Sequence, residues 1–187
     1  MQKFILSVCL SLFLYNSSYA QDDFAHSEIK FNIANTIAIA TVEVGYEYFI
    51  DYNQSIDVQI HFNDRINYHT EKGSREFNTT SFLIGYNFYL TGDPQGSGMH
   101  ISPMVKYRIG DFTETIVDDS GFITVEEDVS TDMSGFIIGI GGGYKFNFGN
   151  QFVFGPFVNI GRNFNEEIKY RFTAIEFNGG ISIGYRF

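Results

Sequence analysis

The fold is decided by the stretch AIEFNGGISIGYRF, which occupies residues 174–187. Its bulky apolar side chains share one set of alternate positions: Ile175, Phe177, Ile181, Ile183, Tyr185 and Phe187. Small, polar or charged residues stand between them, including Glu176 and Arg186. A period of two predicts a β-strand, because successive side chains point to opposite faces. One wide apolar face and one narrow polar face are typical of a strand between lipid and the filled lumen of a barrel.

A strand of a soluble β-sandwich shows the same alternation, so the number of repeats is what matters. Working outward, the pattern predicts eight strands, at residues 28–37, 41–50, 54–63, 77–90, 99–112, 134–148, 151–162 and 174–187. The connections at 51–53, 91–98 and 149–150 are short, whereas those at 64–76, 113–133 and 163–173 are long and polar. Short turns on one side and long loops on the other are typical of a membrane barrel. The predicted fold class is all-β, an eight-stranded antiparallel up-and-down transmembrane β-barrel.

Two features fit this prediction poorly. Residues 38–40 should join the first two strands, yet they include no turn residue. Pro103 and Pro156 fall inside predicted strands, where each removes a backbone donor from a sheet that has no free edge. We therefore expect a bulge or a local distortion at each proline.

The amino terminus reads as a targeting segment. Lys3 precedes an apolar run, and Ala20 ends a small-residue cleavage site, so residues 1–20 are predicted to be a secretory signal peptide. The run is too short for an ordinary membrane helix, which needs about 20 apolar residues. Residues 21–27 would form a periplasmic leader and residues 28–187 the barrel. The single cysteine, Cys9, would leave with the signal peptide.

The formal charge of the chain is −10. A nucleic-acid partner is not expected, because binding phosphates requires a basic face. No later run is apolar and long enough for a membrane helix, so a membrane location would require a closed barrel, in which every backbone group is paired.

The final ISIGYRF at residues 181–187 and the early GYEY at residues 45–48 resemble small bacterial outer-membrane barrels of the OmpX-like and OmpA-type families and the outer membrane protein β-barrel domain families. The resemblance covers residues 28–187 and is one of pattern. It implies a porin-like Gram-negative cell-surface protein in the outer membrane, with both termini periplasmic. It also implies that the barrel-assembly machinery reads the last strand through Ile181, Ile183, Tyr185 and Phe187.

The predicted inward faces carry the charged residues. We expect a lumen charge network of Lys30, Glu43, Glu47, Asp57, His61, Lys106, Arg108, Lys145, Glu176 and Arg186. Eight strands enclose a lumen that side chains can fill, and charges there must be paired. The favoured interpretation is a plug of salt bridges and hydrogen bonds. The alternative is a narrow path for ions or protons, with Glu43, Glu47 and Arg108 as its filter.

The connection at 113–133 is strongly acidic and is a candidate for surface interaction, through Asp118, Asp119, Glu126, Glu127 and Asp128. It is expected to form a hairpin in which residues 118–121 turn between arms at 115–117 and 122–125. Its acids match a calcium loop only in part, because Ile116 would stand at the first ligand position. No metal or cofactor is expected, and binding of a divalent cation at the acidic tip is the alternative.

An esterase is a minor alternative, suggested by His100 and Ser102 on one strand face. Pro103 follows the serine directly, and both side chains point to the lumen. The expected protein is a non-enzymatic structural or surface-interaction barrel that contacts outer-membrane lipid and lipopolysaccharide. Alternatives are an accessory subunit docked on another outer-membrane protein and a narrow ion or small-solute channel.

Overall fold

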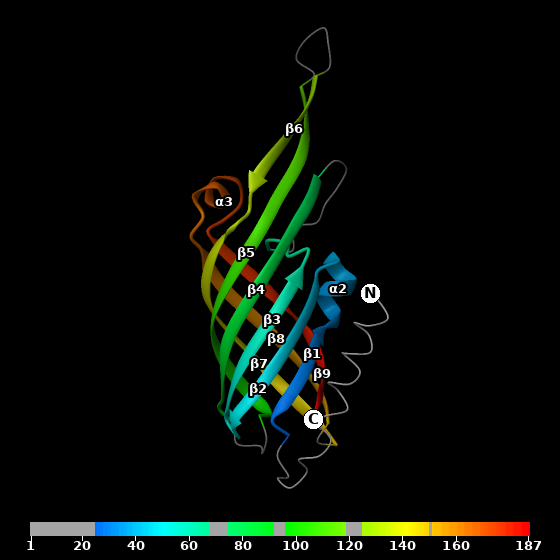
Figure 1. Cartoon of the computed structure of the whole chain (residues 1–187), viewed down its shortest axis with the longest axis vertical. Helices are drawn as coiled ribbons and strands as arrows, with labels where there is room; N and C mark the ends of the chain where they lie inside the picture. Colours follow the sequence, from blue (N-terminus) through cyan, green and yellow to red (C-terminus); the bar gives the residue numbers. More distant parts are fainter. Residues whose placement is uncertain (1–24, 68–74, 92–95, 119–124, 150) are drawn as a thin grey trace, which may run out of the picture.

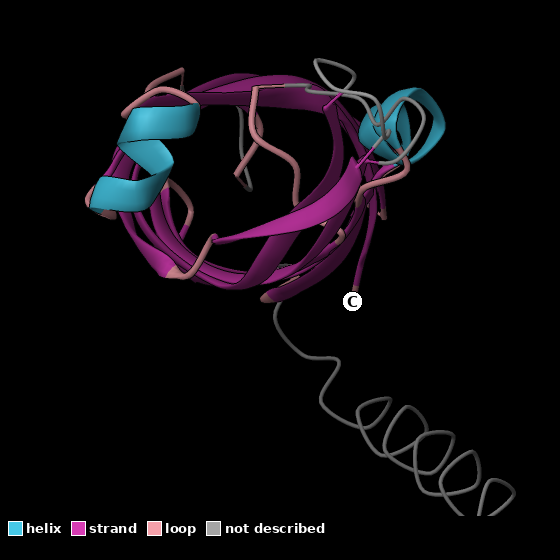
Figure 2. Ribbon diagram, turned by 90° about the horizontal axis from the view of Figure 1, so that it is seen from above, coloured by secondary structure: helices cyan, strands magenta, loops and turns pink. Residues whose placement is uncertain are grey.

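The computed structural model describes residues 25–67, 75–91, 96–118, 125–149 and 151–187. Within them the chain forms a closed antiparallel barrel (Figures 1 and 2). Its eight wall strands are β1 (Ser27–Asn32), β2 (Val42–Asp51), β3 (Gln54–Phe62), β4 (Arg75–Tyr89), β5 (Gly98–Asp118), β7 (Gly135–Phe148), β8 (Phe152–Asn163) and β9 (Ile175–Arg186). Each wall strand pairs with the next, and β1 pairs with β9 to close the ring. The predicted fold class is confirmed.

A ninth strand, β6 (Val125–Asp132), lies outside the ring. It pairs only with the far end of β5, from Asp111 to Asp118, and together they project beyond the wall (Figure 1). The predicted hairpin is present, but its predicted register is wrong. Asp118 pairs with Val125, so residue 118 lies in a strand arm and the connection spans residues 119–124, which are outside the described residues.

Two helices accompany the strands in the described part of the chain. The first predicted strand ends early, because residues beyond Asn32 form α2 (Ile33–Ile39) and not a continuation to residue 37. The Asn32 side chain accepts a hydrogen bond from the Asn35 backbone N–H and so caps the helix, and Ala40 ends it in the left-handed region at φ 53°. The helix α3 (Glu166–Arg171) lies in the predicted loop at 163–173. The strand β1 also begins at Ser27, one residue inside the predicted leader.

The prolines interrupt the ladders without shifting their register. Between β4 and β5 the paired residues stop at Gly85↔Met104 and resume at Phe88↔Ile101, on either side of Pro103. Between β7 and β8 a gap of the same kind lies beside Pro156. Each missing N–H therefore causes a local distortion, and no bulge is needed.

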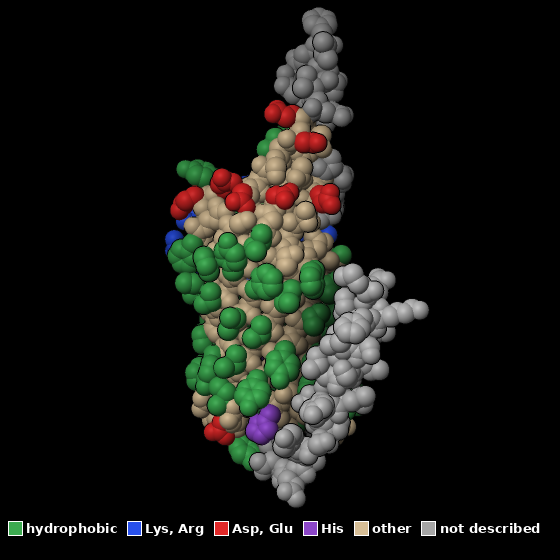
Figure 3. Space-filling view, in the orientation of Figure 1, with side chains coloured by type: hydrophobic (Ala, Val, Ile, Leu, Met, Phe, Trp, Pro, Cys, Tyr) green, Lys and Arg blue, Asp and Glu red, His purple; other side chains and the backbone are tan. Residues whose placement is uncertain are grey.

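The polarity of the barrel is inverted relative to a soluble protein. Large apolar side chains cover the outside of the wall, and most buried charged side chains point to the axis. Figure 3 shows the apolar side chains as a broad zone on the wall, with acidic side chains above it. No helix among the described residues is long and apolar enough to cross a membrane.

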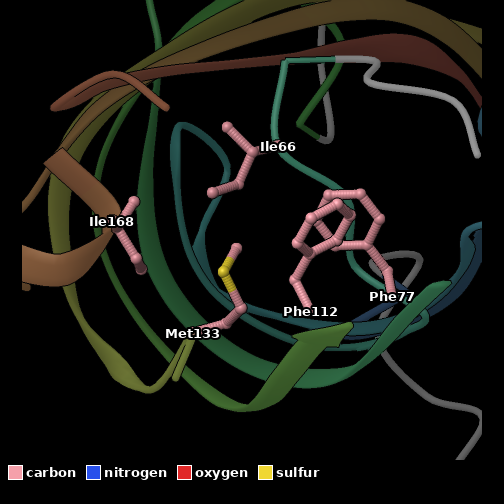
Figure 4. Close-up of a cluster of buried hydrophobic side chains, with 5 residues drawn as sticks. All are labelled: Ile66, Phe77, Phe112, Met133 and Ile168. Atoms are coloured by element: carbon pink, nitrogen blue, oxygen red, sulfur yellow. The ribbon is translucent and has the colours of Figure 1, made fainter. Parts of the chain in front are cut away.

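An apolar cluster fills the mouth of the barrel at the hairpin end (Figure 4). It consists of Ile66, Phe77, Phe112, Met133 and Ile168, all nearly fully buried. The ring centroids of Phe77 and Phe112 lie 4.6 Å apart, and Phe172 packs on both. This end of the lumen is closed by apolar packing that alternation along the strands did not reveal.

Candidate functional site

The candidate site is the set of charged side chains inside the barrel, which the fold sorts into two groups. The lower cluster lies toward the end that holds the carboxyl terminus and comprises Glu28, Lys30, Glu47, Asp57, Lys145 and Arg186. The upper cluster lies nearer the hairpin and comprises Asp64, Lys106, Arg108 and Glu176. Both clusters are electrically balanced.

Glu47 is the hub of the lower cluster. Its Oε2 lies 2.7 Å from Lys145 Nζ and 3.1 Å from Lys30 Nζ. Its Oε1 accepts hydrogen bonds from the Tyr89 hydroxyl at 2.5 Å, and also from Ser55 and Asn87. With this many donors, a carboxylate can stay charged away from bulk water.

Glu28 extends the lower cluster to the end of the chain. It accepts from Lys145 Nζ at 3.0 Å and from Arg186 Nε at 2.9 Å. Arg186 also donates to the Gly96 carbonyl at 2.6 Å and lies over the Phe49 ring. The lower cluster thus fixes the connection between β4 and β5 against the last strand.

The upper cluster is built around Arg108, which is fully buried. Its Nη1 and Nη2 donate to the two oxygens of Glu176 at 2.8 and 2.7 Å, and its Nε and Nη2 donate to Asp64 at 3.1 and 2.9 Å. Lys106 Nζ adds a contact of 2.9 Å to Asp64. Arg108, Asp64 and Glu176 come from three separate parts of the wall. The guanidinium that the two carboxylates share therefore links these parts across the lumen.

Sequence reasoning missed Asp64, which it assigned to a loop. By strand parity residue 64 should point outward, since His61 faces the lumen two residues before Asn63. Asn63 adopts φ 56°, which ends the extended run and turns Asp64 inward. Glu28 was missed as well, although its place on the inward face was readable from the alternation of the first strand.

Glu43 stands apart from both clusters. Its carboxylate accepts hydrogen bonds from three asparagine amides: Asn32 at 2.8 Å, Asn35 at 2.7 Å and Asn178 at 3.2 Å. Of the buried acidic side chains in the described part of the chain, it is the one that has no cation within salt-bridge distance. Its charge is therefore held by amide dipoles alone.

A cavity of about 50 Å³ lies between the clusters. Glu43, Asp57, Lys30 and His100 contribute to its lining. Within the described residues, Asp57 Oδ1 and His100 Nδ1 are buried and have no hydrogen-bond partner. A polar cavity of this size has room for a few water molecules, which would satisfy such atoms.

The histidines that the sequence placed in the lumen do not form a catalytic arrangement. The Ser102 hydroxyl is hydrogen-bonded to the Asn87 side chain, and His100 packs on the Tyr89 ring with centroids 5.3 Å apart. His61 Nε2 bonds to the side chain of Gln59 at 3.0 Å, and its Nδ1 lies 3.8 Å from Asp64. The described residues also include no group of three or more His, Cys, Asp or Glu able to hold a metal ion.

The residues of the predicted assembly signal lie on the outside. Ile181, Ile183, Tyr185 and Phe187 all expose their side chains on the outer face of the last strand or just beyond it. Glu127 and Asp128 are exposed on β6, and Asp128 accepts a hydrogen bond from Thr115 at 2.6 Å. Asp118 and Glu126 lie in the hairpin arms, and Asp119 is outside the described residues.

Comparison with known proteins gives a resemblance of shape. No protein-family model matches the chain, and no curated protein matches it. Among solved structures, the N-terminal β-barrel domain of Pseudomonas aeruginosa OprF is similar, with 15% identity and a TM-score of 0.39. The match covers 86% of this chain and 95% of that one. The fold described above rests on the strand pairing within this chain.

Proposed function

We propose that this protein is an integral barrel of the bacterial outer membrane, without enzymatic activity, which presents an acidic hairpin at the cell surface. The observation that carries the proposal is the inverted polarity of the wall. Side chains such as Ile84, Val158 and Phe136 are more than half exposed, whereas Arg108 and Glu47 are fully buried. Water would oppose that arrangement, and a hydrocarbon environment would favour it.

The aromatic side chains support a particular orientation in the membrane. Tyr46, Tyr48, Phe88, Phe148 and Tyr185 are exposed near the short turns. Aromatic rings prefer the interface between lipid and water, so these residues would mark one membrane surface. We place this end in the periplasm with both termini, and the hairpin outside the cell. The signal peptide at residues 1–20 and recognition of the last strand by the barrel-assembly machinery belong to the same proposal.

The closed lumen supports a structural or surface-interaction role over conduction. The apolar cluster closes one end, and two salt-bridged clusters cross the axis below it. The favoured partners are outer-membrane lipid, lipopolysaccharide and a protein that meets the hairpin. The narrow channel and the accessory subunit remain the competing functions that an experiment must separate.

The test combines fractionation with conductance. Expressed with its own leader, the protein should be recovered with outer membranes, and after purification it should float with liposomes. In planar bilayers it should give no stable open state. Recovery in the soluble periplasm would contradict the membrane proposal. Steady conductance steps would show that the lumen is a channel and not a plug. Co-purification of a constant protein partner in mild detergent would favour the accessory subunit.

A further inference from the structure

The wall of the barrel has one incomplete seam. The strand β1 pairs with β2 only as far as Phe31↔Val44 and with β9 only as far as Asn32↔Ser182. The part of β9 at residues 175–181 therefore has a strand ladder with β8 and none on its other side. We call this gap between β2 and β9 the lateral seam, and α2 occupies it.

Side chains, not a backbone ladder, hold the lateral seam closed. Asn35 on α2 donates to Glu43 on β2 and to Asn178 on β9, both at 2.7 Å. Asn32 packs so closely on β9 that a Cβ added at Gly180 would lie 2.4 Å from its Oδ1. A single asparagine amide thus joins the helix to both edges of the seam.

Higher in the seam, another asparagine covers the strand edge. Asn67 accepts from the Phe177 backbone N–H at 2.7 Å and donates to the Ile175 carbonyl at 3.1 Å. Its side-chain amide takes the place of a neighbouring strand. Backbone groups in contact with hydrocarbon need such partners, so the seam is covered although no strand lies there.

The covering helix is suited to movement. The helix α2 has seven residues, which is too few for a helix that is stable by itself. Ile37 on its outer face is 80% exposed, and Ile33 is exposed as well. Few buried contacts beyond Asn35 and Ile39 hold the helix in place, and segments held in this way open most readily.

Behind the helix lies Glu43, the buried acidic side chain that has no cation nearby among the described residues. Glu43 has three amide donors and no cation, and it lines the cavity that also contains Asp57 Oδ1, an acceptor without a donor among the described residues. Opening of α2 would let a cation approach this carboxylate, which accepts only amide hydrogen bonds from the described residues in the closed state.

We propose that the lateral seam is a side entrance, gated by α2, through which an amphipathic amine in the lipid phase places its ammonium head group against Glu43. The positive head group matches the unpaired carboxylate, and a cavity of about 50 Å³ admits a head group but no alkyl chain. The chain would stay on the apolar surface beside Ile37 and Phe177. This inference rests on the membrane location proposed above.

The experiment measures access to the cavity from the lipid. A reporter thiol replaces Ser182, which lines the cavity, in the full chain with Cys9→Ser. In liposomes, N-ethylmaleimide should label the reporter about tenfold faster in Asn35→Ala than in the parent. Asn147→Ala is the matched control, because the Asn147 Oδ1 is buried without a partner and lies away from the seam. Equal rates in the two variants would overturn the gate.

The second arm tests the ligand class and needs no weakened helix. Octylammonium should slow labelling of the reporter about tenfold in the parent, and Glu43→Gln should abolish this protection. Octanol should slow labelling of the reporter in neither the parent nor Glu43→Gln. Protection that survives Glu43→Gln, or its absence in the parent, would overturn the amine site.

Flotation of each variant with liposomes separates the two proposals. If the protein floats but shows neither effect, the side entrance is contradicted and the membrane function still stands. If the protein does not float, the membrane function is contradicted, and so is the side entrance, which depends on it.

Discussion

Arg108 is the residue on which the upper half of the lumen depends. It contacts both Asp64 and Glu176, and its side chain has no exposure to solvent. A buried ion pair contributes little relative to a well-packed apolar substitute, but removal of one partner leaves the others charged and unpaired. Substitution of a single cluster member is therefore expected to destabilise the barrel.

Substitution Arg108→Met should lower the free energy of unfolding by about 3–5 kcal/mol, because two carboxylates lose their shared guanidinium. Urea titration of the protein in detergent micelles measures the change. The matched control is Arg75→Met, whose side chain is 50% exposed beside Glu114 and should contribute no more than about 1 kcal/mol. Equal losses in the two variants would show that the upper cluster does not stabilise the barrel.

At this scale the sequence predicted most of the lumen residues but not their connections. Alternation placed Glu47, Lys106 and Arg108 on the inward face, where the structure has them. It failed at Asp64, because the positive φ of Asn63 ends the extended run and turns the next side chain inward. It also did not predict that Asn32, Asn35 and Asn178 meet at Glu43, since α2 was not predicted and Asn178 is distant in the chain.

Among the elements, α2 was the least predictable. Ile29, Phe31 and Ile33 continue one alternation, so nothing in the apolar pattern marks the end of β1 at Asn32. The deciding contact is the capping bond from Asn35 to the Asn32 side chain, at 3.2 Å. The sequence does not show whether an asparagine lies in a strand or caps a helix. The contacts with the neighbouring strands determine which conformation forms.

The apolar cluster at the mouth is expected to behave as a small hydrophobic core. Substitution Phe112→Ala should lower the unfolding free energy by about 3–5 kcal/mol, because it leaves a cavity between Phe77 and Phe172. Phe136→Ala, on the exposed face of β7, is the control and should cost distinctly less. Denaturant titration distinguishes the two, and an unaffected Phe112→Ala variant would mean that the cluster is not a core.

The projecting hairpin should be dispensable for folding. Beyond Glu114, which is the last residue of β5 to pair with β4, β5 pairs only with β6. Replacing residues 115–128 with Asn-Gly makes Glu114↔Val129 the closing pair of a two-residue turn. The variant should float with liposomes and change the unfolding free energy by less than about 1 kcal/mol. Failure to insert would show that the hairpin takes part in assembly.

For the molecule as a whole, the central claim is that the barrel is inside out relative to a soluble protein. The eight-stranded wall was predictable because a period of two survives every local exception, including both prolines. The two ends of the lumen were not, since they are closed by loops and helices whose contacts span many residues. The lateral seam and the apolar cluster both lie where the regular pattern stops.

The most direct test is a spin-label scan along β4 in liposomes, one cysteine at a time from residue 80 to residue 88. Labels at Phe82 and Ile84 should be readily reached by oxygen and not by a nickel chelate, because these positions are exposed on the outer face. Labels at Ser81, Leu83 and Gly85 should be reached poorly by both. Access of the nickel chelate to Phe82 and Ile84, or the loss of the two-residue alternation, would contradict the account.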